Sequence, residues 1–259
     1  MGRAKIDRTG EENVNNFGSK MIISKYNNKN DIDVYFPEYN WTFHHAIYYA
    51  FKKGQIKCVY ERRVYGVGFM GIGEYSSKEN GKITKCYEVW HSMLQRCYYD
   101  KFQDRKPTYK GCEVCESWHN FQTFAEWYEN NYYEIPGKVM SLDKDILVKG
   151  NKIYSPNTCV FVPQEINLLF VKRDKSRGKY PIGVRVMPSG NYQVRCNNGY
   201  GKDIYLGTYS NSKEAFRVYK QYKEKLIKET INSYEGVIPE PHYSKLKNAI
   251  YNYKVEITD

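Results

Sequence analysis

The chain has 259 residues, of which 41% are hydrophobic and 27% charged, so it is long enough for two or three small domains with modest cores. No apolar run is long enough to cross a bilayer, and residues 1–20 have no apolar segment typical of a secretory signal, so we expect a cytoplasmic protein without a membrane partner. The seven cysteines are expected to stay reduced in that compartment.

Charge and aromatic content point to nucleic acid as the partner. Forty Lys and Arg against 29 Asp and Glu give a net charge of +11, and aromatic residues make up 16% of the chain. Positive charge releases counterions from a phosphate backbone, and aromatic rings stack on bases. The alternative is a lysine-rich surface that is simply solvated, with tyrosines filling small cores.

The N-terminal part predicts a small β-rich module over residues 21–75. Residues 1–20 mix charged, Gly and Asn residues with little periodicity, which is typical of a flexible lead-in. Two strand-like runs follow, and the aromatic residues of segment 41–51 favour a short helix. The neighbouring His44 and His45 would point in different directions, which favours surface or packing positions over a chelating pair.

Two amphipathic helices are predicted next. Apolar residues recur at spacings of three and four within segments 87–99 and 118–128, so each segment should present one apolar face to the other.

A C-x-x-C pair, Cys112 and Cys115, lies between these helices. A structural zinc site needs four ligands, and the most plausible partners are Cys97 with Cys159, or a histidine such as His119. Only half of a zinc motif is therefore present, and packing of small side chains beside a turn is the alternative.

Residues 141–173 have a strand, loop, strand, helix pattern. Segment 142–148 is strand-like, a loop rich in Gly, Asn and Pro follows, segment 159–162 is a short strand, and Pro163 begins a helix.

A characteristic set of residues extends from the first predicted helix through this segment. Its members are Tyr87, Trp90, Met93, Arg96 and Cys97; Val114, Cys115, Trp118, Phe121 and Phe124; Leu142, Asp143 and Lys144; and Tyr154, Pro156 and Asn157. Over about a third of the chain, this pattern resembles the HNH endonucleases of phages and mobile introns. The resemblance implies a ββα-metal finger that holds one divalent ion, Mg²⁺ or Mn²⁺, and hydrolyses a phosphodiester bond.

The resemblance also implies roles for single residues. Asp143 falls on the metal-binding aspartate, Asn167 on the helix ligand and Asn157 on the asparagine that orients the loop. Asp145, two residues along the same predicted strand, would share a face with Asp143 and complete an oxygen-rich metal site.

Lys144 falls where the family has its histidine base. No histidine occurs between His119 and His242, and lysine is ordinarily a poor base at neutral pH. Either the site is degenerate, or the base is a desolvated Lys144, or it is a histidine of the preceding helices such as His91 or His119. The bland alternative is that Asp143, Lys144 and Asp145 are surface charges.

Segment 179–230 predicts three strands and a helix. Along the first two strands, alternation puts Arg185 on the face opposite Val184 and Val186, and Arg195 on the face opposite Val194 and Cys196. One face of the sheet should therefore be core and the other basic.

This segment also carries a family pattern, made by Gly183, Val184, Gly190, Tyr192, Val194, Tyr205, Leu206, Gly207, Tyr209, Glu214 and Ala215. The pattern resembles the plant ethylene-response-type (APETALA-like) DNA-binding domain, which lays its sheet in the major groove. The resemblance implies that Arg185, Gln193, Arg195 and Lys202 contact bases or phosphates. A solvated basic face is the alternative.

Together these patterns predict a multi-domain α+β protein: a lead-in over 1–20, a β-rich module over 21–75, a central ββα-metal domain over 86–173, a three-stranded sheet with a helix over 179–230, and a tail over 231–259. The expected function is that of an HNH-like endonuclease that binds double-stranded DNA. The alternatives are a degenerate DNA-binding protein or regulator, and a phage-encoded inhibitor whose partner is a host defence enzyme. The sequence leaves the oligomeric state open.

Overall fold

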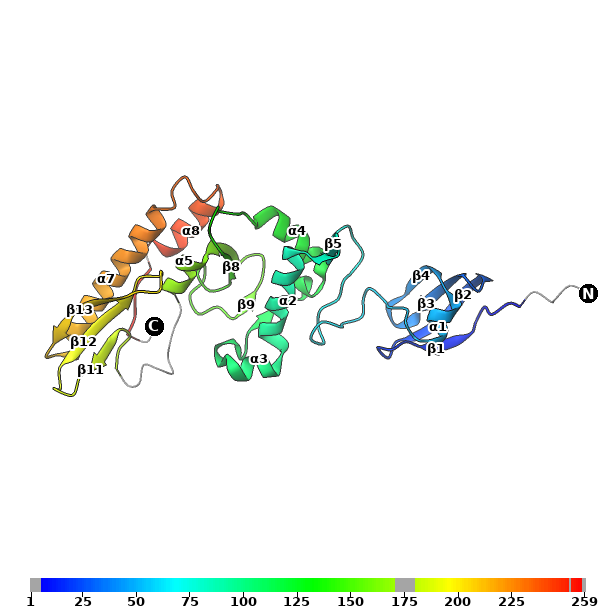
Figure 1. The fold of residues 1–259 in the computed structure, drawn as a ribbon, viewed down its shortest axis with the longest axis horizontal. Helices are drawn as coiled ribbons and strands as arrows, with labels where there is room; N and C mark the ends of the chain where they lie inside the picture. Colours follow the sequence, from blue (N-terminus) through cyan, green and yellow to red (C-terminus); the bar gives the residue numbers. More distant parts are fainter. Residues whose placement is uncertain (1–5, 171–179, 252, 258–259) are drawn as a thin grey trace, which may run out of the picture. The chain divides into compact units, whose positions relative to one another are not determined.

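The computed structural model describes residues 6–170, 180–251 and 253–257, and the chain divides into two compact units, Met1–Glu126 and Trp127–Asp259. The fold is multi-domain α+β, as the sequence predicts, with several small sheets and separate helices (Figure 1). In the part of the chain that is described, no helix is long and apolar enough to span a membrane.

The first unit begins with a four-stranded antiparallel sheet whose strands follow chain order (Figure 1). The strands are β1 (Glu12–Val14), β2 (Lys20–Asn28), β3 (Asp31–Phe36) and β4 (Trp41–Ala46), and a short 3-10 helix, η1 (Pro37–Tyr39), joins the last two. Alternate residues of β3, namely Ile32, Val34 and Phe36, are fully buried. They pack with Phe51 of helix α1 (Tyr48–Lys52) in one core.

Two expectations for this module are wrong. Segment 41–51 is not one helix, because residues 41–46 pair with β3 as a strand and the helix is confined to α1. The predicted lead-in contains a strand, since Glu12 and Val14 of β1 pair with Ile22 and Lys20 of β2. In both places pairing with the neighbouring strand of the sheet decides the structure, and local composition does not report that pairing.

The rest of the first unit is mainly helical and follows the predicted pattern. Helix α2 (Lys85–Tyr98) starts at Thr84, whose hydroxyl accepts the Tyr87 N–H at 3.3 Å, and it buries Trp90, Met93, Leu94 and Cys97. The Trp90 indole donates to the Trp118 carbonyl at 2.7 Å. The remaining elements are β5 (Lys78–Glu79), β6 (Lys82–Ile83), α3 (Asp100–Arg105), η2 (Pro107–Tyr109), β7 (Glu113–Val114) and η3 (Glu116–His119). Helix α4 (Phe121–Asn131) begins in this unit and continues past its last residue, Glu126.

The second unit contains the predicted strand, loop, strand, helix pattern. Its elements are β8 (Met140–Asp143), β9 (Ile153–Tyr154), β10 (Val160–Pro163) and α5 (Gln164–Leu169). Strands β8 and β10 are antiparallel, with Asp143 opposite Val160, and α5 packs against both strands. The buried Phe161 lies among Trp127, Tyr128 and Tyr132, with ring centroids 5.1 to 5.5 Å apart. We call residues 140–170 the finger.

A three-stranded antiparallel sheet and a long helix complete this unit (Figure 1). The elements are β11 (Val184–Val186), β12 (Tyr192–Asn197), β13 (Asp203–Tyr209) and α7 (Ser212–Asn232). Helix α7 packs on all three strands, and Val184, Val194 and Cys196 are buried with Ala215 and Tyr219 of the helix.

The segment after α7 packs against both the finger and the sheet. It contains helix α8 (His242–Ile250), and Val255 beyond it joins the core of the sheet domain. The Tyr234 hydroxyl donates to Glu165 of α5, and the ring of Tyr253 lies 5.0 Å from that of Phe170. The segment that the sequence predicted as a tail with a short helix over 243–253 therefore ties the finger to the sheet domain.

Candidate functional site

Asp143 lies at the point where β8 ends. Its Oδ1 accepts the backbone N–H groups of Asp145 at 2.8 Å and Ile146 at 2.7 Å, and these bonds turn the chain out of the strand. The predicted strand over residues 142–148 is therefore wrong beyond Asp143, and the exposed Asp145 belongs to the loop and not to the same strand face.

Burial, followed by the neighbouring Asp145 carboxylate, raises the pKa of Asp143 to about 6. The Asp145 carboxylate is therefore close enough to disfavour the negative charge on Asp143. A divalent cation would favour the charged form of both, so this pair of oxygen donors fits Mg²⁺ or Mn²⁺.

Lys144, at the position that the family resemblance assigns to the base, is buried. Its Nζ donates to the Asn151 carbonyl at 3.0 Å and lies 3.5 Å from Asp145 Oδ2. It also lies 5.8 Å from the centre of the Tyr154 ring. Lys144 Nζ therefore acts as a hydrogen-bond donor to the loop.

The asparagine that ties the finger loop to the first strand is Asn151. Its Nδ2 donates to the carbonyls of Lys144 and Ile153, both at 2.7 Å, and its Oδ1 accepts the Ile153 N–H at 3.2 Å. The loop-orienting role that the sequence predicted for Asn157 therefore belongs to Asn151, while the Asn157 side chain is exposed in the turn before β10. The sequence feature that could have pointed to Asn151 is its position directly after Gly150 within the predicted loop.

Asn167, the predicted helix ligand, is half-buried on α5. Its backbone carbonyl accepts the Phe170 N–H at 3.0 Å and so ends the helix. Because α5 packs on β8, the fold brings the helix of Asn167 and the strand of Asp143 together in one finger.

The two histidines considered as bases belong to the first unit. His91 lies among aromatic rings, 5.0 Å from the ring centre of Tyr65 and 5.9 Å from that of Tyr87. Burial lowers its pKa, and burial followed by the nearby Arg62 lowers the pKa of His119. Both imidazoles therefore favour the neutral form.

The predicted zinc ligands divide between the units. In the described part of the first unit, Cys97, Cys112 and Cys115 do not bring their three sulfur atoms within 4.8 Å of one another. Instead, Cys112 Sγ donates to the Thr108 carbonyl at 3.9 Å. Cys159 is buried in the second unit, and all seven cysteines are thiols.

Among the residues described, one group of three His, Cys, Asp or Glu side chains has its ligand atoms within 4.8 Å of one another, namely Asp31, Asp33 and His45 on the N-terminal sheet. His45 Nδ1 lies 2.9 Å from Asp31 Oδ1, and His44 Nδ1 lies 3.2 Å from Asp33 Oδ2. Both histidines are exposed, as predicted, and each has an aspartate as its partner. An irregular register between β3 and β4 brings them opposite β3, which the sequence does not reveal.

The exposed face of the C-terminal sheet carries the predicted DNA-contacting residues. Arg185 lies directly opposite Gln193, and Arg195 opposite Tyr205. The Arg195 Nε donates to Gln193 Oε1 at 3.1 Å, so both side chains lie on one face. Lys202 is exposed in the turn before β13.

The two-faced sheet predicted from alternation is therefore confirmed for Val184, Val194 and Cys196, which are buried, but not for Val186, which is 38% exposed at the end of β11. Tyr205, which is 54% exposed between the arginine and the turn, is a member of this face that was not predicted from the sequence as a contact residue.

Comparison of this chain with family models, with curated proteins and with solved structures finds no match. The described residues offer two chemistries: a buried carboxylate beside a second carboxylate on a ββα finger, and a cationic sheet face with a neighbouring aromatic ring.

Proposed function

We propose that this protein binds double-stranded DNA through its C-terminal sheet and hydrolyses a phosphodiester bond at the finger with one divalent cation, Mg²⁺ or Mn²⁺. The observation that carries the proposal is the buried Asp143 carboxylate beside Asp145 at the end of β8, with α5 packed against that strand. Asp143, Asp145 and Asn167 are the residues that would hold the cation.

The cation would supply positive charge to the departing oxygen of the cleaved phosphodiester. The chain itself contributes a rigid loop, because Asn151 and Lys144 bond across it. Arg185 and Arg195 would attract the DNA backbone or read guanine in the major groove.

A second candidate function is DNA binding without cleavage. It is favoured by Lys144, whose Nζ donates to the loop and so gives the finger no general base at that position. Under this alternative the finger is a scaffold for the sheet domain.

A nicking assay on supercoiled DNA with Mg²⁺ or Mn²⁺ separates the two functions. Wild type should nick the plasmid, and Asp143→Ala and Asn167→Ala should each reduce the rate about a hundredfold or more. Asp104→Ala, an exposed aspartate of the first unit, is the matched control and should nick like wild type. Equal nicking by all four proteins, or none by wild type with either metal, would leave only DNA binding.

A binding titration tests both functions at the sheet. Replacing Arg185 and Arg195 by Ala should weaken duplex binding and reduce the slope of log affinity against log salt by about one for each phosphate that the variant no longer neutralises. Lys213→Ala, an exposed lysine at the start of α7, is the control. Unchanged binding of the double variant, with a host protein retained in a pull-down, would favour the inhibitor instead.

A further inference from the structure

A small aromatic pocket lies beside the N-terminal sheet, in the first unit. Its volume is about 360 Å³, and its lining residues are Tyr39, Asn40, Trp41, Tyr60, Arg62 and Phe69. The rings of Trp41 and Tyr60 are nearly perpendicular at 6.4 Å, and those of Tyr60 and Phe69 are 6.0 Å apart. The four aromatic residues are only half-buried, so their rings keep accessible surface.

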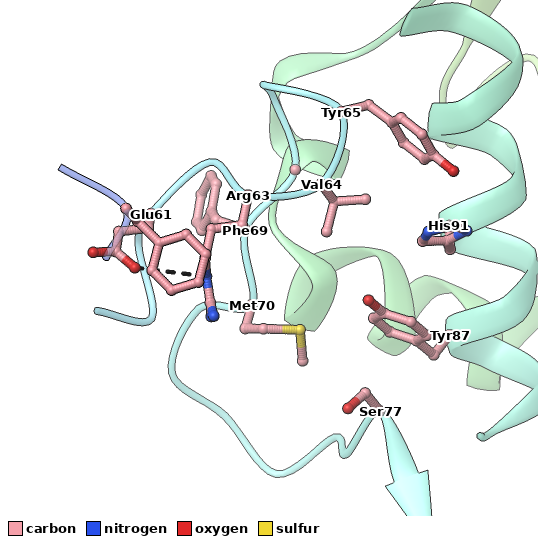
Figure 2. Close-up of a pocket in the computed structure, with 11 residues that line it drawn as sticks. Glu61, Arg63, Val64, Tyr65, Phe69, Met70, Ser77, Tyr87 and His91 are labelled. Carbon is pink, nitrogen blue, oxygen red and sulfur yellow. Dashed lines mark ion pairs between the residues drawn. The ribbon is translucent and has the colours of Figure 1, made fainter. Parts of the chain in front are cut away.

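A second pocket of about 530 Å³ shares Phe69 as a wall. Figure 2 shows Tyr87 and His91 projecting from α2, with Tyr65 above them and Phe69 and Met70 on the loop across the pocket. Arg63 also lines this pocket, whereas its neighbour Arg62 lines the first one. Two consecutive arginines therefore line two adjacent pockets, each with aromatic walls.

The two arginines differ in their surroundings. Arg63 is paired with the buried Glu61, at 3.6 Å (Figure 2). The Arg62 guanidinium lies 5.7 Å from the centre of the Phe69 ring and 3.4 Å from His119 Nδ1. Neither the Phe69 ring nor His119 carries negative charge. These two contacts therefore leave the positive charge of Arg62 available to a ligand or to solvent.

The chemistry of the first pocket selects its ligand. Aromatic walls bind quaternary ammonium groups or flat bases, but a guanidinium at the wall repels a cation. A nucleotide satisfies both features, since its base has a π-face for the rings and its phosphate pairs with Arg62. Bases inside a duplex are already stacked, which leaves unpaired bases as the ligand.

We propose that these two pockets bind neighbouring unpaired bases of a single-stranded nucleic acid, with Arg62 contacting the backbone between them. The proposal rests neither on cleavage by the finger nor on binding by the C-terminal sheet. RNA and single-stranded DNA share this chemistry, and the experiment distinguishes them.

The test measures anisotropy of a labelled strand of about twelve nucleotides, as DNA and as RNA, with the full-length protein. Tyr60→Leu and Arg62→Ala should each weaken binding roughly tenfold, while Tyr60→Phe should retain it. Tyr49→Leu is the matched control, because Tyr49 is 65% exposed and lies outside both pockets. The Arg185→Ala and Arg195→Ala double variant should keep single-strand binding, which separates this site from the sheet.

Oligonucleotides with abasic sites provide a second measurement on the wild-type protein, so the test holds even if Tyr60→Leu does not fold. Removing the bases while keeping the phosphates should lower affinity roughly tenfold. Equal affinity for the abasic strand, or equal affinity of Tyr60→Leu and Tyr49→Leu for the intact one, would overturn the proposal.

Discussion

At the scale of single residues, the finger contains a charge that the fold disfavours. The pKa of Asp143 is raised to about 6 from 3.8, because its carboxylate is buried and lies beside Asp145. The folded state therefore holds this proton more tightly than the unfolded state. In metal-free protein, stability should fall as the pH rises from about 4 to about 6, and the decrease should be complete above that window.

Asp143→Asn tests this linkage. Asparagine keeps the oxygen that accepts the two backbone N–H groups but carries no charge, so the free energy of unfolding should rise by about 3 kcal/mol at about pH 8. The two proteins should differ little at about pH 4, where both side chains are largely neutral. Urea denaturation in EDTA at the two pH values measures this, and an equal gain at both would show that the charge of Asp143 is not the cause.

The sequence singles out some residues of the finger and not others. Asp143 is predicted as a metal ligand from its position within a recurring pattern, and that position can be read from the neighbouring residues alone. The role of Asn151 is not, because several asparagines lie near the loop and only the folded loop selects the one that bonds to Lys144. The contact of Lys144 with that loop likewise depends on its three-dimensional path.

At the scale of elements, Gly183, directly before β11, lies against Tyr219 of α7. Its φ is +74°, and a Cβ added there would lie 2.0 Å from Cδ2 of Tyr219 on the helix. Gly183→Ala should therefore lower the free energy of unfolding by about 3 kcal/mol, through the unfavourable φ and the displaced ring.

Gly190→Ala is the matched control, because Gly190 has a similar φ of +83° but nothing within 4 Å of the added Cβ. It should cost only about 1 kcal/mol, from the backbone conformation alone. Thermal unfolding of both variants measures the difference, and equal destabilisation would show that the contact with Tyr219 contributes nothing.

The elements themselves were predictable to an uneven degree. Amphipathic α2 and the alternating strand β12 follow from periodicity, since a buried face imposes a repeat on the sequence. In β11 only Val184 is buried, because the strand ends at Val186 before a second residue is covered. Strand β4 does not, because its aromatic residues suit either element and pairing with β3 decides. The early end of β8 depends on side-chain bonds of Asp143 that no periodicity reports.

At the scale of the whole molecule, the segment after α7 makes the second unit a single packed body. Leu246 of α8 is fully buried, whereas Asn248 of the same helix is exposed. Leu246→Ala should lower the free energy of unfolding by about 3 kcal/mol, and Asn248→Ala should change it little.

The destabilisation by Leu246→Ala should reach beyond α8. Amide hydrogen exchange should accelerate together in β10 of the finger and in β12 of the sheet, because both belong to one cooperative unit. Exchange that accelerates in only one of these strands would show that the finger and the sheet domain unfold separately.

The bond of Tyr234 to Glu165 and the contact of Tyr253 with Phe170 also have a geometric consequence for DNA. These contacts hold the sheet and the finger at a fixed separation. If the sheet binds a DNA sequence while the finger binds a phosphate, the packed segment after α7 sets the number of base pairs between the two contact points. Loosening the contacts of Tyr234 and Tyr253 would then let the cut positions spread.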